Sequence, residues 1–151
     1  MENLHTNNQF ALLLEAALST DNKTAWRFTA KLFKEVTDND KRLKSHVNKM
    51  ISILPKVRDN HQRELLRVLN IMEINDKLEG SLFNSCIEIW KNTKKIPSVR
   101  ICAFKLLKRI SDKYPELNAE VALLASNQYT KSLSPGIKIS LERLIIPKTH
   151  L

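Results

Sequence analysis

Glycine and proline are scarce in this chain of 151 residues, which has 2 glycines and 5 prolines. An all-β sandwich needs many tight turns, and these two residues are favoured in such turns, so the composition excludes that class. The same shortage excludes a glycine-rich phosphate-binding loop and the G-x-S-x-G motif of serine hydrolases. Neither a β-sandwich nor an active site that depends on glycine fits the chain.

Long apolar runs and paired cysteines are also missing. The longest apolar runs, such as residues 10–14, are far too short to cross a bilayer, so we expect no membrane-spanning segment. The N-terminus lacks the basic start and small-residue cleavage site of a signal peptide. Cys86 and Cys102 lack the spacing of a metal site and are interpreted as small apolar residues in a reducing compartment. The expected location is the cytoplasm.

No constellation of catalytic residues stands out. The four histidines are scattered, and none has a second ligand at metal-binding spacing. Asp38 and Asp40 lie in a short loop and are interpreted as helix caps. We therefore predict no catalytic residue, no metal site and no cofactor, and we expect a protein that is not an enzyme.

Apolar residues recur every three or four positions along most of the chain, which indicates amphipathic helices. Proline, aspartate and asparagine mark the helix starts, as at Pro97 and Pro135. The eight predicted helices span about 12 to 18 residues each, near 8–19, 22–37, 41–54, 60–72, 76–92, 97–112, 116–132 and 135–146.

Every second helix repeats one pattern, in which a basic residue follows the first turn and apolar residues follow at helical spacing. The basic residues are Arg27, Arg63, Arg100 and Lys138, separated by 36, 37 and 38 residues. In this alignment Ala103 has Ala30, Leu66 and Leu141 as its copies on the buried stripe. A period of this length, with two helices in each copy, is typical of a repeat protein.

The stretch Pro97–Ile110 reads P-x-V-R-x-x-A-x-x-x-L-x-x-I, and this pattern resembles the second helix of HEAT-repeat and armadillo-like α-solenoids. The resemblance implies an all-α, right-handed α-α superhelix of about eight helices in four antiparallel pairs. The chain would form a single solenoid domain over residues 1–151. Its repeat units would lie near 8–37, 41–74, 76–112 and 116–146, followed by a short tail at 147–151.

The net charge of the chain is +9, and most of it falls on the predicted second helices. The resemblance implies that these helices line the concave side of the solenoid, where a basic surface attracts anionic partners. The candidate partner-binding residues on this face are Arg27, Lys31, Arg63, Arg67, Arg100, Lys105, Lys108, Lys138 and Arg143. For the recurring basic position a structural role is an open alternative, because in such repeats it often bonds neighbouring loops.

Apolar residues fall on the same predicted face. They are Phe28, Leu32, Val68, Ile71, Ile101, Ile139 and Ile146. A mixed apolar and basic face suits a protein or an acidic peptide, so we predict a non-enzymatic scaffold. One alternative is that these residues only pack against neighbouring helices. Another is binding of a nucleic-acid backbone, because some short HEAT-like solenoids resemble DNA alkylation-repair glycosylases.

The last predicted helix carries more apolar residues than one buried stripe needs, including Ile139 and Ile146. Terminal repeats of a solenoid require a polar outer face. We therefore also expect weak self-association into a homodimer through this C-terminal helix.

Overall fold

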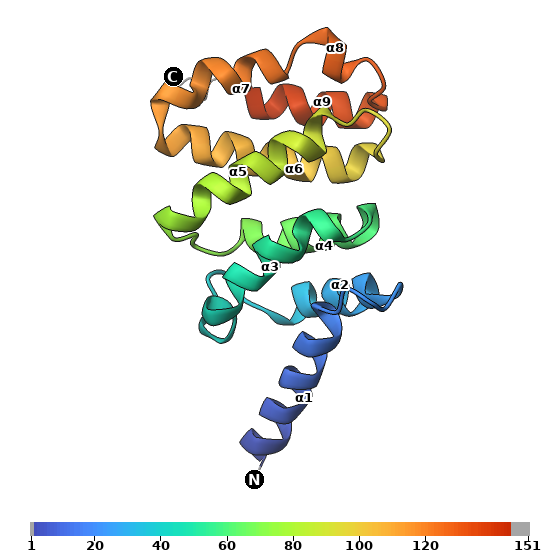
Figure 1. The fold of residues 1–151 in the computed structure, drawn as a ribbon, viewed down its shortest axis with the longest axis vertical. Coiled ribbons are helices and arrows are strands. Elements are labelled where there is room, and N and C mark those ends of the chain that lie inside the picture. The colour runs from blue at the N-terminus through green and yellow to red at the C-terminus, as the bar shows by residue number, and fades with distance from the viewer. Residues whose placement is uncertain (1, 146–151) are drawn as a thin grey trace. The chain divides into compact units, whose positions relative to one another are not determined.

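Helices are the only regular elements in residues 2–145, the part of the chain that the computed structural model describes. This part contains nine α-helices, which are labelled in Figure 1, and three short 3₁₀ helices, which are called η here. They are α1 (Glu2–Ala17), α2 (Ala25–Glu35), η1 (Lys41–His46), α3 (Val47–Ile53), η2 (Leu54–Lys56), α4 (Asp59–Asn70), α5 (Asp76–Lys91), α6 (Pro97–Lys113), η3 (Pro115–Leu117), α7 (Asn118–Leu124), α8 (Asn127–Thr130) and α9 (Pro135–Ile145).

The all-helical prediction is confirmed, and the handedness of the superhelix stays a prediction. The chain divides into two compact units, an N-terminal unit (Met1–Leu78) and a C-terminal unit (Glu79–Leu151). The division falls in the first turn of α5, just inside the third predicted repeat unit. No helix in the described residues is long and apolar enough to cross a membrane.

The N-terminal unit is built on α2, which packs against both α1 and α4. The buried stripe of α2 consists of Ala25, Thr29 and Leu32. The predicted copies Leu66 and Ala103 are fully buried, but Ala30 is only half-buried. The predicted register of α2 is therefore wrong by one residue, because Trp26-Arg27 was aligned with Val99-Arg100 and the core residues lie one position earlier.

One continuous helix over residues 41–54 was expected, and this prediction is wrong. Asp40 caps the segment by accepting a hydrogen bond from the N–H of Arg42, at 3.0 Å. The N–H of Leu43 then donates to the carbonyl of Asp40, three residues back, which is the tighter bonding of a 3₁₀ helix. The chain becomes α-helical only at Val47 and tightens again around Pro55.

The C-terminal unit is built around α6, which packs against α7 and α9. Trp90 and Phe104 are among its largest buried side chains, and their ring centroids lie 4.8 Å apart. The polar side chains in its core are hydrogen-bonded, since no buried side-chain nitrogen or oxygen in the described residues lacks a hydrogen-bond partner.

The single helix predicted over residues 116–132 is also wrong, because this segment consists of η3, α7 and α8. Ser126 has an extended backbone between α7 and α8. The break leaves the carbonyl at the end of α7 without a helical partner, and the indole N–H of Trp90 donates to it, at the Leu124 oxygen, over 2.6 Å. The sequence pattern gave no sign that a side chain from another helix would take this carbonyl.

Candidate functional site

The structure places the nine predicted binding residues in different environments. Six are exposed, two are half-buried and one is buried. The exposed residues are Arg27, Lys31, Arg67, Lys105, Lys138 and Arg143. Arg63 and Lys108 are half-buried, and Arg100 is buried.

Arg100 is fully enclosed by protein, so its prediction as a partner-binding residue is wrong. Its Nε donates to the carbonyl of Trp90 at 2.8 Å, and its terminal nitrogens donate to the Tyr129 carbonyl and, at 3.4 Å, to the Ser132 hydroxyl. The guanidinium also lies 4.6 Å from the centre of the Trp90 ring. Burial lowers the pKa of Arg100, but arginine remains charged at neutral pH. Arg100 therefore ties α6 to α5 and to the segment around α8.

Two other side chains make the corresponding bond in the N-terminal unit. Nε2 of Gln62 donates to the carbonyl of Leu54 at 2.9 Å, and Oγ1 of Thr29 donates to that of Ala17 at 2.8 Å. Each acceptor lies at the end of the preceding helical segment, where carbonyls have no partner within the helix. The side chains that make this bond are thus Thr29, Gln62 and Arg100, and only Arg100 belongs to the basic series at 27, 63, 100 and 138.

Arg63 and Arg67 lie together on α4, where both pair with Glu64. The distances are 3.2 Å from Arg63 Nε and 3.3 Å from Arg67, and only 3% of Glu64 is exposed. The guanidinium of Arg67 also stacks on Phe33 of α2, 4.5 Å from the ring centre. These two arginines therefore already have an acidic partner within the protein, which leaves less of their charge for a binding partner.

The basic residues of the C-terminal unit also differ in whether an acidic side chain pairs with them. Lys108 pairs with Asp112 one helical turn later. Lys105 on α6 and Lys138 and Arg143 on α9 form no ion pair with any described residue. These three remain available to a partner.

Three of the six predicted inner-face apolar residues that the structure describes are buried in the core, and Ile71 is half-buried. Leu32, Val68 and Ile101 are buried, which confirms for them the alternative of packing against neighbouring helices. Phe28 and Ile139 are exposed, and Ile146 lies outside the described residues.

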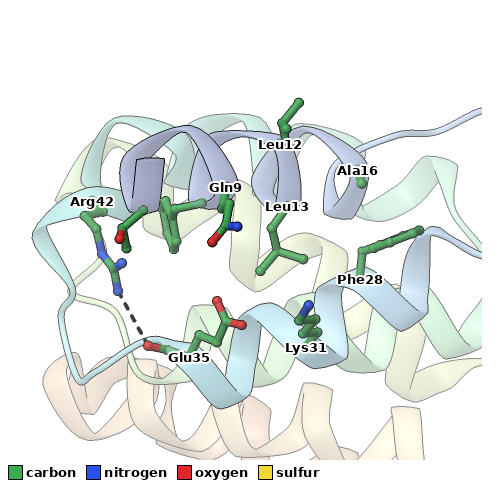
Figure 2. A pocket seen from close by; sticks show the side chains of 10 residues that line it. Gln9, Leu12, Leu13, Ala16, Phe28, Lys31, Glu35 and Arg42 are labelled. Atoms are coloured by element: carbon green, nitrogen blue, oxygen red, sulfur yellow. Dashed lines mark hydrogen bonds between the residues drawn. The ribbon is translucent and has the colours of Figure 1, made fainter. Parts of the chain in front are cut away.

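A groove between α1 and α2 combines exposed apolar and basic side chains (Figure 2). It encloses about 430 Å³ and is lined by Leu12 and Leu13 from α1 and by Phe28 and Lys31 from α2. Leu12 is 67% exposed and Phe28 is 38% exposed. Lys31 forms no ion pair with any described residue, although Glu35 lies one turn away in the same groove.

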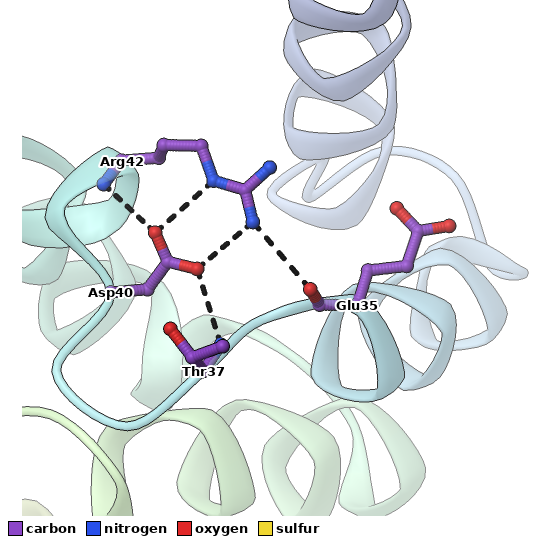
Figure 3. Close-up of polar contacts among 4 residues, drawn as sticks. All are labelled: Glu35, Thr37, Asp40 and Arg42. Atoms are coloured by element: carbon purple, nitrogen blue, oxygen red, sulfur yellow. Dashed lines mark hydrogen bonds and ion pairs between the residues drawn. The ribbon is translucent and has the colours of Figure 1, made fainter.

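One end of the groove is fixed by Arg42 (Figure 3). The carboxylate of Asp40 accepts two hydrogen bonds from its guanidinium, at 2.9 and 3.1 Å, and another from the N–H of Thr37 at 3.2 Å. These bonds hold the pKa of Asp40 far below its usual range. The guanidinium lies 4.0 Å from the ring centre of Phe10, so Arg42 is held in place as a wall of the groove.

The sequence analysis identified Phe28 and Lys31 but not the groove itself. Its α1 wall was missed because Phe10 and Leu13 fit an ordinary buried stripe at helical spacing. The exposed Leu12 next to that stripe was the one available signal, since a surface leucine on an amphipathic helix suggests a second contact face.

The comparison with known families agrees with the repeat pattern. A family model described as a HEAT repeat domain matches residues 2–147, nearly the whole chain. No curated protein and no solved structure is significantly similar to this chain. The helix pairs, the repeat period and this match lead to one conclusion: the chain belongs to the HEAT repeat family, whose domains suggest protein-interaction scaffolds.

Proposed function

We propose that this protein is a non-enzymatic interaction module that binds a protein segment with apolar side chains next to acidic ones. The observation that carries the proposal is the α1–α2 groove, whose lining combines the exposed Leu12 and Phe28 with Lys31, a cation that has no ion pair with any described residue. An amphipathic helix commonly places its apolar face in such a groove. The partner would set its apolar side chains on Leu12, Leu13 and Phe28.

Lys31 adds selectivity more than affinity. An exposed ion pair contributes only about 0–1 kcal/mol, because water screens it. A cation at the rim of an apolar groove nevertheless favours partners with a carboxylate at the right distance and disfavours basic ones. Arg27 is exposed one helical turn before Lys31 and extends this basic edge along α2.

The alternative of nucleic-acid binding has less support from the same residues. A nucleic-acid backbone is bound through many simultaneous contacts from free cations. Arg100 is enclosed in the core, Arg63 and Arg67 share Glu64, and Lys108 pairs with Asp112. The described basic residues therefore offer fewer free charges to phosphates than the sequence count suggests.

A direct test uses a synthetic amphipathic helical peptide, with leucine on one face and glutamate beside it, titrated into the isotope-labelled full chain. We expect chemical-shift changes at Leu12, Phe28 and Lys31. Lys31→Glu should weaken binding of this peptide by about three- to tenfold, which corresponds to the loss of one attraction and the gain of one repulsion. Lys44→Glu is the matched control, because Lys44 is exposed in the same unit but does not line the groove.

A peptide in which every glutamate is replaced by lysine should bind more weakly to the wild type and more tightly to Lys31→Glu. Equal affinity of the two peptides for both proteins would exclude an acidic partner at this groove. Shift changes confined to other helices would exclude the groove. A duplex DNA that binds at low salt more tightly than the acidic peptide would favour the nucleic-acid alternative.

A further inference from the structure

A second cavity in the N-terminal unit, of about 340 Å³, is separate from the groove and shares none of its lining residues. Its walls are the loop between α1 and α2 with the first turn of α2, and the segment from η2 to the first turn of α4. The loop is fixed by Asn22, whose Oδ1 accepts hydrogen bonds from the N–H and the hydroxyl of Thr24, each at 2.9 Å. The cavity is therefore built by two segments that are distant in the sequence.

Three cations and one acid line this cavity. Lys23 comes from the first segment, and Lys56 and Arg58 come from the second. All three are exposed, and none forms an ion pair with any described residue. Asp21 is the acidic residue among the lining residues, so positive charge exceeds negative charge at the cavity. Such a site attracts an anion.

His61 lines the same cavity and is only 6% exposed. Its Nε2 lies 2.7 Å from the carbonyl oxygen of Ala17, which can only accept, so Nε2 carries the proton. Burial lowers the pKa of His61, so the ring is neutral at neutral pH and Nδ1 is an acceptor. Nδ1 has no hydrogen-bond partner among the described residues. Since no buried side-chain nitrogen in them lacks a partner, Nδ1 is not sealed from solvent, and His61 lines the cavity.

We propose that this cavity binds inorganic phosphate, with Lys23, Lys56 and Arg58 contacting its charged oxygens and Nδ1 of His61 accepting a hydrogen bond from its O–H. The site offers three cations to an anion and one acceptor, Nδ1, to a hydrogen-bond donor. At neutral pH inorganic phosphate meets both requirements, because it keeps a proton on one oxygen.

The need for an O–H that can donate to Nδ1 disfavours similar anions. Sulfate and phosphodiesters have no O–H at neutral pH, so Nδ1 would face a lone pair, which is repulsive in a buried setting. Phosphate monoesters such as AMP and O-phosphoserine have a second pKa of about 6 and have lost most of that proton at neutral pH. The site should therefore prefer free phosphate to its esters, and esters to sulfate.

Isothermal titration calorimetry of the full chain, at neutral pH and constant ionic strength in a buffer without phosphate, tests this order. We expect phosphate to bind about tenfold or more tightly than sulfate, which is the effect of one buried hydrogen bond made or missed. AMP and O-phosphoserine should fall between the two anions. Equal affinity for phosphate and sulfate, no binding of either, or tighter binding of an ester would each overturn the assignment.

The contribution of the cations is tested with Lys56→Gln/Arg58→Gln, two substitutions of exposed side chains. We expect this variant to lose phosphate binding by about tenfold or more. The control is Lys44→Gln/Lys49→Gln, which removes the same charge from exposed positions outside the cavity and should bind phosphate as the wild type does. An equal loss in both variants would show that only net charge attracts the anion, and would overturn the site.

The role of His61 can be observed without mutating it. The imidazole Nδ1 resonance of His61 should shift when phosphate is added and should stay in place when sulfate is added. His46 serves as an internal control, because it lies in η1 and does not line the cavity. Binding of phosphate with no change at His61, or the same change with sulfate, would contradict the proposed hydrogen bond.

Discussion

The two units of this protein satisfy the same structural need with different chemistry. In each, a side chain near the start of a second helix bonds a carbonyl at the end of the helical segment before it. The N-terminal unit uses the neutral residues Thr29 and Gln62, whereas the C-terminal unit uses the charged Arg100. What repeats along this chain is therefore a bonding geometry, and the residue that supplies it varies.

The charged side chain of Arg100 connects more of the chain than the neutral side chains of Thr29 and Gln62 do. The guanidinium of Arg100 has acceptors on Trp90, Tyr129 and Ser132, which belong to α5, α8 and the segment after α8. Gln62 and Thr29 bond to a helical segment that directly precedes them. A buried charge is expensive to desolvate, so it stabilises the fold only while all its acceptors are present.

The largest effect should come from Arg100→Ala. This change leaves three acceptors without their donor and a cavity beside Trp90, and we expect it to lower the free energy of unfolding by about 3–5 kcal/mol. Urea denaturation followed by circular dichroism measures it. Lys105→Ala, an exposed site on the same helix, should change stability by less than about 0.5 kcal/mol. Similar losses in the two variants would refute the structural role of Arg100.

A smaller effect is expected at Gln62 in the N-terminal unit. Gln62→Met keeps the size of the side chain and removes the donor to the Leu54 carbonyl, which should cost about 1–2 kcal/mol. Arg63→Met removes the neighbouring residue of the basic series, whose half-exposed ion pair should contribute less than about 1 kcal/mol. If Arg63→Met proves the more damaging in the same denaturation experiment, the bonding position is the basic series after all.

Thr29→Val should have the smallest effect, less than about 1 kcal/mol. The Ala17 carbonyl also accepts a hydrogen bond from His61, so it keeps one donor after the substitution. In a His61→Leu background the same change removes the second donor, and its cost should increase. A double-mutant cycle measures this coupling, and purely additive losses would show that the two donors do not share the carbonyl.

The sequence predicted the helices best where a proline or an aspartate starts them and apolar residues follow without interruption. The predicted starts at Pro97, Asp76 and Pro135 match those of α6, α5 and α9. The segments 41–54 and 116–132 were predicted as single helices because their apolar spacing continues through the breaks. Their breaks depend on bonds that periodicity does not report: a local cap at Asp40 and a distant indole, Trp90, at the Leu124 carbonyl.

The candidate sites were less predictable than the fold. A run of basic residues shows where charge can be, but Glu64 and the burial of Arg100 decide how much of it a partner meets. His61 was interpreted only as one of four scattered histidines. Its significance comes from a bond to Ala17, 44 residues away, which no local pattern contains.

The partners of Arg100 also set an order of events during synthesis. Tyr129 and Ser132 follow Arg100 by 29 and 32 residues, whereas the carbonyls that Thr29 and Gln62 bond are made before those residues. At translation rates of about 5–20 residues per second, roughly 2–6 seconds pass between the synthesis of Arg100 and that of its last acceptors. Until then the guanidinium has only the Trp90 carbonyl and water as acceptors, so the packing of α6 around it is completed only after α8 has been made.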